Sequence, residues 1–259
     1  MTQARRNTVK PLAFGFLLAA LASYPARADQ RDDFIAGRSK DCAGCDLSGV
    51  SFKRKDLSGV NLSGANLADA NFHDARLTNA TLAGADLTGA NLNKADLIRA
   101  NLSGAKMHQA MLYAARLDGA KLAGADLSQA MMGAVRASRA DFSKANLQSV
   151  DLRKSRIADS DFSNADLTQV AFDYAFARAS NFNGASLVGA RLLNAEFMQT
   201  HLEKADLSNV DAFGAKMREA DLSSAILSGT SFRRADLTDA KLEGSLFGKT
   251  QMPDGTVTP

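Results

Sequence analysis

The chain has few of the residues from which most metal and cofactor sites are built. Its 259 residues include two cysteines, three histidines and no tryptophan. A structural zinc site needs four ligands, and Cys42 and Cys45 have no two further ligands near them in the sequence. His73, His108 and His201 are scattered without ligand spacing, so we expect them on a solvated surface. The sequence therefore predicts no metal site and no cofactor.

Motifs of common enzymes are also missing. G-x-S-x-G, the phosphate-binding loop and H-E-x-x-H do not occur. Cys42 and Cys45 form a C-x-x-C pair, but no thioredoxin-like βαβ pattern surrounds it, and haem attachment would need His where Asp46 stands. No catalytic residue is predicted; thiol–disulfide chemistry at the two cysteines is the enzymatic alternative.

A long apolar run is absent, but a short one stands near the N-terminus. Arg5, Arg6 and Lys10 precede an apolar run over residues 12–22, and an A-x-A site ends at Ala28. This pattern predicts a secretory signal peptide over residues 1–28, cleaved between Ala28 and Asp29. The run is shorter than the roughly 20 residues that span a bilayer. We therefore expect a periplasmic or secreted bacterial protein with no membrane span after cleavage.

The export route stays open between the general secretory and the twin-arginine pathways. Arg5 and Arg6 fit the twin-arginine route, whereas Thr8 and Val9 do not give its usual hydrophobic pair. No cysteine follows the cleavage site, so a lipoprotein anchor is not expected.

The mature chain also lacks a large excess of charge of either sign. The full sequence carries +3. The leader holds four of the 31 basic residues and none of the 28 acidic ones, so the mature charge is −1. A near-neutral chain gives no reason to expect binding to nucleic acid or to anionic lipid.

What the sequence does have is a large apolar residue at every fifth position, here called position i, from residue 42 to residue 252. Leu, Phe, Met or Ile fills 39 of these 43 positions. The exceptions are Cys42, Ala137, Ala177 and Ala212. Position i−2 holds a small or compact residue at nearly every repeat. Such fixed-period similarity marks a repeat architecture.

A period of five fits neither regular element. Helical residues advance about 100° each, so the apolar positions would wander around a helix. Strand side chains alternate with a period of two, so every second apolar residue would face water. The backbone must therefore turn every five residues. Position i+2 is often Gly, which accepts the positive φ of a tight corner, and position i−1 is often Asp or Asn, which can bond to nearby backbone.

At this point the chain resembles the pentapeptide repeat family, whose pattern is A-(D/N)-L-x-x. The segments "GANLADANF" and "AGADLTGANLNKADL" match it directly. The resemblance implies an all-β fold, a right-handed quadrilateral β-helix with four pentapeptides per coil and about ten coils here. The expected organisation is a cap segment over residues 29–41, with a short helix at 32–36, the β-helix over 42–252, and a C-terminal tail over 253–259. A turn at 252–255 is expected to stop the coil, and residues 256–259 should be loose.

By repeat position, Cys42 and Cys45 should both point inward at the first coil. In an oxidising compartment two cysteines suggest a disulfide. We expect a structural pair, bridged or unbridged, that closes the N-terminal end of the rod.

Sorting outward residues by position modulo 20 gives four faces, two of them with routine small polar residues. The face centred on Leu97 and Leu117 is rich in Arg, and its neighbour carries Met and Tyr, residue types that are enriched in binding interfaces. The predicted docking edge comprises Arg116, Arg136, Arg139, Arg156, Arg178, Met111, Tyr113, Met131 and Tyr174. The alternative is drift on a tolerant surface, with Phe176 and Phe213 turned inward beside Ala177 and Ala212.

The sequence thus favours a non-catalytic, exported rod that acts as a scaffold or binds an unidentified protein partner. Two alternatives stay open. Some members of the resembled family mimic DNA and protect gyrase, although a near-neutral, arginine-bearing, exported chain departs from that pattern. A self-assembling structural protein, associating through its apolar face, is the other.

Overall fold

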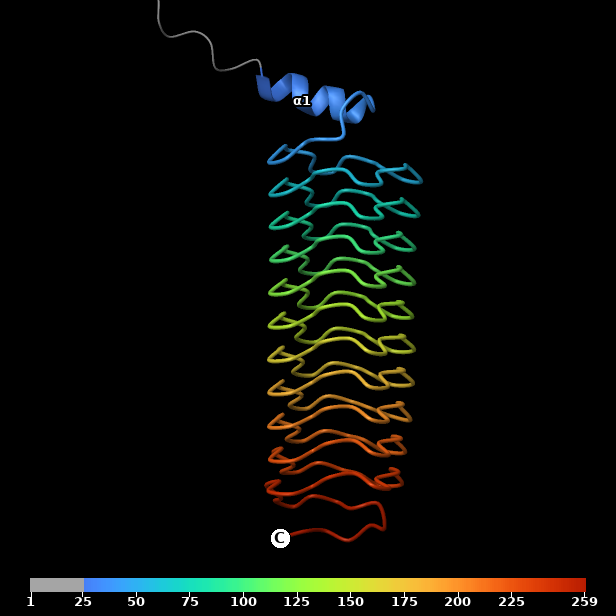
Figure 1. The fold of residues 1–259 in the computed structure, drawn as a ribbon, viewed down its shortest axis with the longest axis vertical. Coiled ribbons are helices and arrows are strands. Elements are labelled where there is room, and N and C mark those ends of the chain that lie inside the picture. The colour runs from blue at the N-terminus through green and yellow to red at the C-terminus, as the bar shows by residue number, and fades with distance from the viewer. Residues whose placement is uncertain (1–25) are drawn as a thin grey trace, which may run out of the picture.

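The computed structural model describes residues 26–259, and these form a straight rod of stacked coils (Figure 1). A single helix, α1 (Ala26–Ile35), covers the N-terminal end of the rod. The predicted leader lies outside the described residues except for Ala26–Ala28, which belong to α1.

The register of the coils is constant along the rod. Each residue at i−1 pairs in parallel with the residue 20 positions later, from Asp41 with Asn61 to Ser231 with Gln251. A shift of 20 residues is four pentapeptides, so each coil has four short sides and the rod has between ten and eleven coils. Each pairing is a bridge of single residues, and the sides are too short to form longer strands.

All five backbone N–H groups of a regular pentapeptide find an acceptor, as buried backbone groups require. The groups at i, i+2 and i−1 bond to the neighbouring coils, and that at i+3 closes the turn onto the carbonyl of i. The fifth, at i+1, is bonded by the Asp or Asn side chain at i−1. The repeat around Leu47 is typical: Leu47 N to Asn66 O 2.8 Å, Gly49 N to Ala68 O 2.8 Å, Val50 N to Leu47 O 3.1 Å and Ser48 N to Asp46 Oδ1 3.1 Å.

The corners confirm the expected positive φ at i+2. Every residue at this position from 44 to 249 has φ between about +50° and +75°. With a hydrogen bond from i+3 to i, this is the type II turn, whose third residue is left-handed. Many of these residues are not glycine but Asn, Asp, Lys, Arg, Gln or Ala.

The interior is filled by positions i and i−2, which are almost fully buried throughout the middle coils. Identical side chains stack from coil to coil. Phe142, Phe162 and Phe182 lie with ring centroids 4.7 and 4.9 Å apart and nearly parallel planes. This distance matches the spacing of about 4.8 Å between neighbouring strands.

The space beside the small Ala177 is filled from within. Phe172 and Phe197 lie in the core with centroids 5.4 Å apart, and Phe182 contacts both rings. The suggestion that Phe176 and Phe213 turn inward is wrong. Both rings stay on the surface, where arginine side chains lie over them, since their outward repeat position cannot reach the core.

Hydroxyl groups that replace Ala at i−2 are buried and satisfied. Ser160 Oγ donates to Ala137 O at 2.6 Å, and Thr230 Oγ1 donates to Leu207 O at 2.6 Å. Among the described residues no buried side-chain nitrogen or oxygen lacks a partner.

The two ends of the rod differ. At the N-terminal end, Phe34 of α1 is buried and packs edge-on against Phe52 at 5.8 Å, and Arg31 Nε donates to Asp46 O at 2.8 Å. The expected short helix at 32–36 is α1, which begins six residues earlier. At the C-terminal end the tail is not loose, because Val257 pairs antiparallel with Gln251.

Candidate docking surface

The coil register places the predicted docking residues on two neighbouring sides of the rod and two corners. Arg116, Arg136 and Arg156 occupy position i−1 of successive coils on this side, here called the arginine side. Tyr113 and Tyr174 lie on the corner before it. The other predicted residues are Arg139 and Arg178 on the corner after it, and Met111 and Met131 on the side before the tyrosine corner.

The three arginines of the arginine side form a ladder of like charges. Arg116 pairs with Arg136, and Arg136 with Arg156, through parallel bridges. Like charges directly opposite each other destabilise a sheet. Arg116 is relieved by an ion pair with Asp96 at 3.2 Å, and the Arg156 guanidinium lies 5.9 Å from the ring centroid of Phe176.

Arg136, in the middle, has no such partner within residues 26–259. It lines a hollow of about 490 Å³, here called the arginine hollow. Arg99 and Arg139 line the same hollow, and neither forms an ion pair within the described chain. The remaining lining residues are Ile98, Asp118, Gly119, Ser138 and Asp159.

Gly119 opens this hollow because it stands at i+2 between Arg99 and Arg139, where a side chain would otherwise project. A Cβ on Gly119 would meet only Arg99 Cγ, at 3.5 Å. Asp118 is already engaged, since its Oδ1 accepts the backbone N–H of Ser138 at 3.2 Å. In other repeats, Asp or Asn at i−1 accepts the N–H of i+1. Here Arg136 stands at i−1 and offers no acceptor, so Asp118 of the preceding coil accepts the N–H of Ser138 instead.

Arg178 lies further along the rod and does not line the hollow. Its Nε donates to Gln199 Oε1 at 3.0 Å. Arg178 therefore extends the positive surface along the rod, and Arg156 lies between Arg178 and the arginine hollow.

The tyrosine corner holds a second hollow, of about 370 Å³, here called the tyrosine hollow. Tyr113 and Tyr174 are 56% and 60% exposed and flank it, although they are 61 positions apart. Gly133 and Ala134 lie between them, and their small size leaves the bottom of the hollow open. Met131 on the adjoining side is 49% exposed, and it stacks on Met111 through a parallel bridge.

Two ion pairs hold the wall of the tyrosine hollow. Arg153 donates to both oxygens of Asp151 at 2.9 and 2.7 Å. This hydrogen bonding lowers the pKa of Asp151 against the opposing effect of burial. Arg191 binds Asp173 in the same bidentate manner, which raises the pKa of Arg191. The charged groups of Arg153, Asp151, Arg191 and Asp173 are therefore already hydrogen-bonded to each other.

Sequence reasoning missed Gly119, Gly133 and Asp173 as parts of this surface, and it did not foresee that Asp118 bonds to the backbone of the next coil. A signal for the acids was present: Asp at i+1 occurs where the i−1 residue one coil later is Arg. Asp173 Oδ1 accepts the N–H of Leu193 at 3.3 Å because Arg191 stands at i−1. Asn93 Oδ1 accepts the N–H of Tyr113 in the same way, at 2.8 Å, because Met111 stands at i−1.

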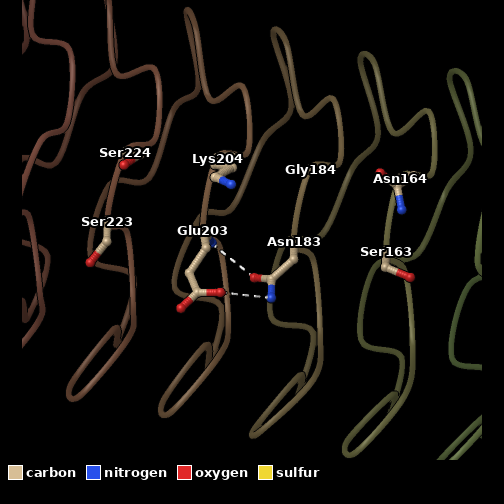
Figure 2. A pocket seen from close by; sticks show the side chains of 8 residues that line it. All are labelled: Ser163, Asn164, Asn183, Gly184, Glu203, Lys204, Ser223 and Ser224. Atoms are coloured by element: carbon tan, nitrogen blue, oxygen red, sulfur yellow. Dashed lines mark hydrogen bonds between the residues drawn. The ribbon is translucent and has the colours of Figure 1, made fainter.

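A third hollow, of about 520 Å³, lies on a corner of routine composition (Figure 2). Ser, Asn and Gly dominate its lining, and Asn183 bonds to Glu203 twice, to the backbone N–H at 2.9 Å and to the carboxylate at 3.0 Å. Its polar groups serve the corner itself, in contrast to the arginine hollow.

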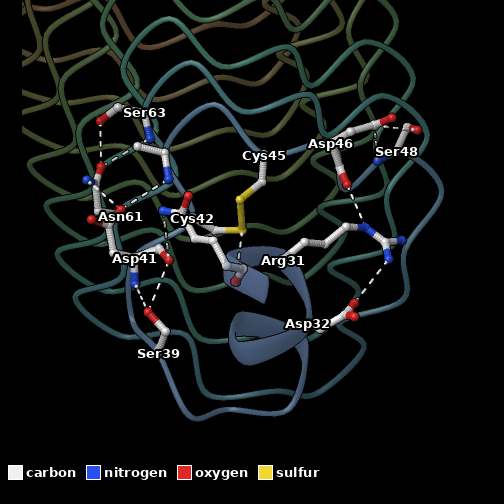
Figure 3. Close-up of a disulfide and its surroundings, with 12 residues drawn as sticks. Arg31, Asp32, Ser39, Asp41, Cys42, Cys45, Asp46, Ser48, Asn61 and Ser63 are labelled. Carbon is white, nitrogen blue, oxygen red and sulfur yellow. Dashed lines mark hydrogen bonds and ion pairs between the residues drawn. A yellow bond between two sulfur atoms is a disulfide. The ribbon is translucent and has the colours of Figure 1, made fainter. Parts of the chain in front are cut away.

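At the first coil the structure joins Cys42 and Cys45 by a disulfide. Figure 3 shows it beside α1, where Cys42 Sγ lies 3.9 Å from Gln30 O. Both cysteines are buried, so they lie in the core at the capped end. This geometry is that of a structural element.

Within residues 26–259 no cluster of three or more His, Cys, Asp or Glu side chains could hold a metal ion. In the same range no helix has both the length and the apolar character needed to cross a bilayer.

The family model for pentapeptide repeats matches overlapping segments that together run from residue 41 to residue 250, with a short break at 174–177. The chain belongs to the pentapeptide repeat family. Membership and the 20-residue register together confirm the right-handed quadrilateral β-helix. No curated protein matches the sequence significantly.

Several solved structures are similar to this family member. One is HetL, a pentapeptide repeat protein involved in heterocyst differentiation regulation in the cyanobacterium Nostoc, with 26% identity, coverage of 89% of this chain and 98% of that one, and a TM-score of 0.36. QnrB1, a plasmid-mediated fluoroquinolone resistance protein, has 15% identity, 76% and 89% coverage, and a TM-score of 0.38. A protein of the Arabidopsis thaliana thylakoid lumen has 23% identity, 64% and 70% coverage, and a TM-score of 0.21. At these TM-scores the likenesses carry no argument about function.

Proposed function

We propose that this chain is an exported, non-catalytic rod that binds a partner protein through the arginine side and its two corners. The observation that carries the proposal is the ladder Arg116–Arg136–Arg156, set between two hollows. Arg and Tyr are the residue types most enriched at the energetic centres of protein interfaces. A ladder of like charges is costly for the free rod, and a partner would relieve that cost.

Export rests on the leader pattern at residues 1–28. An alkaline phosphatase fusion to the full chain should be active in a bacterial host, because this reporter folds only in an oxidising compartment. Deleting residues 1–25 should abolish that activity. An active fusion without the leader, or an inactive one with it, would contradict export.

Binding is tested with a tagged rod of residues 29–259 in periplasmic extract. Triple charge reversal at Arg116, Arg136 and Arg156 to Glu should release a partner that the wild type retains. The matched control is charge reversal at Lys121, Lys144 and Lys204, three exposed lysines on other parts of the coil. A partner held equally by all three rods, or lost equally from both variants, would contradict docking at the arginine side.

The DNA-mimic alternative fits the surface poorly. A mimic needs a dominant negative surface, whereas this rod presents a positive ladder and a mature charge near zero. Cytosolic localisation of the full chain would revive it.

A further inference from the structure

The arginine hollow has the composition of an anion site that is open in the free rod. Arg99, Arg136 and Arg139 line it, and within the described chain none of them is paired with a carboxylate. Of its two acids, Asp118 already accepts a backbone N–H. Three arginines against the two acids Asp118 and Asp159 leave the hollow with a formal charge of +1, whereas the mature chain as a whole carries −1.

The ladder shows where the negative charge is needed. Arg116 forms an ion pair with Asp96, and Arg156 lies over the ring of Phe176. The repulsion between the arginines of the ladder is therefore uncompensated at Arg136, which also lines the hollow. Opposite charge placed there would contact Arg136 from the ladder and Arg139 from the corner at once. Gly119 leaves the space for it.

The guanidinium geometry favours a carboxylate. Arg presents a planar fork that binds carboxylate or phosphate oxygens in pairs, and clusters of Arg recognise acidic motifs. The positive surface also extends along the rod axis. Arg99 and Arg178 are about four coils apart, which is roughly 19 Å at 4.8 Å per coil, and an extended chain covers this length with about six residues at 3.3 Å each.

We propose that the arginine hollow binds the carboxylates of an acidic, extended segment of a partner protein, lying along the rod axis. The inference rests on the proposed docking function and names the chemistry of the partner. Acidic side chains of this segment fill the hollow at Gly119. The residues before and after them in the segment lie over Arg116 and Arg156.

The test uses a pair of matched substitutions. Gly119→Asp places a carboxylate in the hollow, where it competes internally for Arg99 and Arg139. Gly124→Asp is the same change at the same repeat position on the next corner, where an added Cβ would meet nothing within 4 Å. The fold accepts Asp at i+2, because Asp69, Asp74, Asp159 and Asp239 stand there with positive φ.

The probe is hexaglutamate with blocked ends, titrated against residues 29–259 at low salt, with hexaglutamine as the neutral control. Wild type and Gly124→Asp should bind hexaglutamate alike. Gly119→Asp should bind it about tenfold more weakly or worse, the effect of losing one or two hydrogen bonds to charged groups. Equal binding by the two Asp variants, or equal binding of hexaglutamine, overturns the inference.

A second variant separates fork geometry from bulk charge. Arg136→Lys with Arg139→Lys keeps the charge and removes the fork, so hexaglutamate affinity should fall several-fold. Unchanged affinity would overturn carboxylate recognition at this hollow. Heparin binding through the same arginines without hexaglutamate binding would also overturn it, in favour of a sulfated glycan.

The two proposals fail separately. If the triple reversal of Arg116, Arg136 and Arg156 releases the partner but hexaglutamate does not bind, docking stands and the acidic segment is wrong. If hexaglutamate binds through Gly119 but the partner is retained by the triple variant, the anion site stands and the docking function is wrong.

Discussion

At every corner of the rod one residue must adopt left-handed backbone, and most of these residues are not glycine. A residue with a Cβ pays roughly 1–2 kcal/mol for this conformation. Asn and Asp tolerate it better than Ala does. The corners therefore hold a set of small, separate strains that the stacking of coils overcomes.

Ala179 is one such strained residue, with φ of 56°. Replacing it by Gly should raise the free energy of unfolding by about 0.5–1 kcal/mol, since the strain removed exceeds the added entropy of an unfolded Gly. Urea denaturation measures this. Ala185→Gly at a buried i−2 position is the control and should destabilise. A lower midpoint for Ala179→Gly would contradict the strain argument.

Asp at i−1 makes the rod sensitive to acid. Hydrogen bonding from Ser223, partly opposed by burial, and the ion pair with Lys241 lower the pKa of Asp221 from 3.8 to about 2. Because the folded pKa is depressed, the stabilisation is fully present above pH 3.8 and is lost as the pH falls through about 2.

Asp221→Asn should keep the acceptor for the Ser223 N–H, as Asn does at many other repeats, but lose the ionised form. The stability difference between wild type and this variant should shrink as the pH is lowered from 5 to 2. Chemical denaturation at a series of pH values measures it. A difference that stays constant over this range would show that Asp221 does not contribute through its charge.

A single coil is the element of this fold, and it cannot bury its apolar residues alone. Leu122 is fully buried in mid-rod, stacked between the coils before and after it. Solenoid stability is a sum of such nearest-neighbour contacts, so a fault in one coil interrupts the stack.

Leu122→Lys should abolish cooperative folding, because an unpaired charge in the core costs several kcal/mol. Ala123→Lys, one residue later and on the surface side, should leave the melting temperature nearly unchanged. Circular dichroism melts compare the two. A melting temperature for Leu122→Lys within a few degrees of wild type would refute this account of the core.

The last coil is the weakest element. The backbone N–H groups of Leu237, Leu242 and Phe247 have no acceptor among the described residues, and Leu246 and Phe247 are exposed. We expect amide hydrogens of residues 237–252 to exchange much faster than those of the first coil, which α1 covers. Mass spectrometry of hydrogen exchange tests this, and equal protection at the two ends would contradict it.

At the scale of the whole molecule, the five-residue period predicts most of the architecture, because every Leu, Phe or Met at i must face one axis. The number of sides came from the family resemblance, and the 20-residue bridges confirm it. The sequence could place Tyr113 and Tyr174 on one corner. It could not show that they flank one hollow, since that depends on how Arg153 folds onto Asp151.

The same limit applies to the arginine hollow. Position modulo 20 brings Arg136 and Arg139 to one region, but their lack of acid partners depends on side-chain orientation. Asp118 and Asp159 stand close enough in the repeat to neutralise them, yet neither forms an ion pair there. The role of Phe176 was misjudged for a related reason: neighbouring Phe side chains, not the surface ring, fill the space beside Ala177.

The four-sided register also constrains how such a gene can change in length. Removing one pentapeptide, for example residues 122–126, would leave every later apolar residue pointing inward, so the core would survive. Everything beyond the deletion would, however, turn by a quarter of a revolution. Arg116 would no longer share a side with Arg136 and Arg156, and Tyr113 would no longer share a corner with Tyr174. Insertions and deletions that preserve the surface therefore come in whole coils of 20 residues, whereas those that preserve only the fold come in fives.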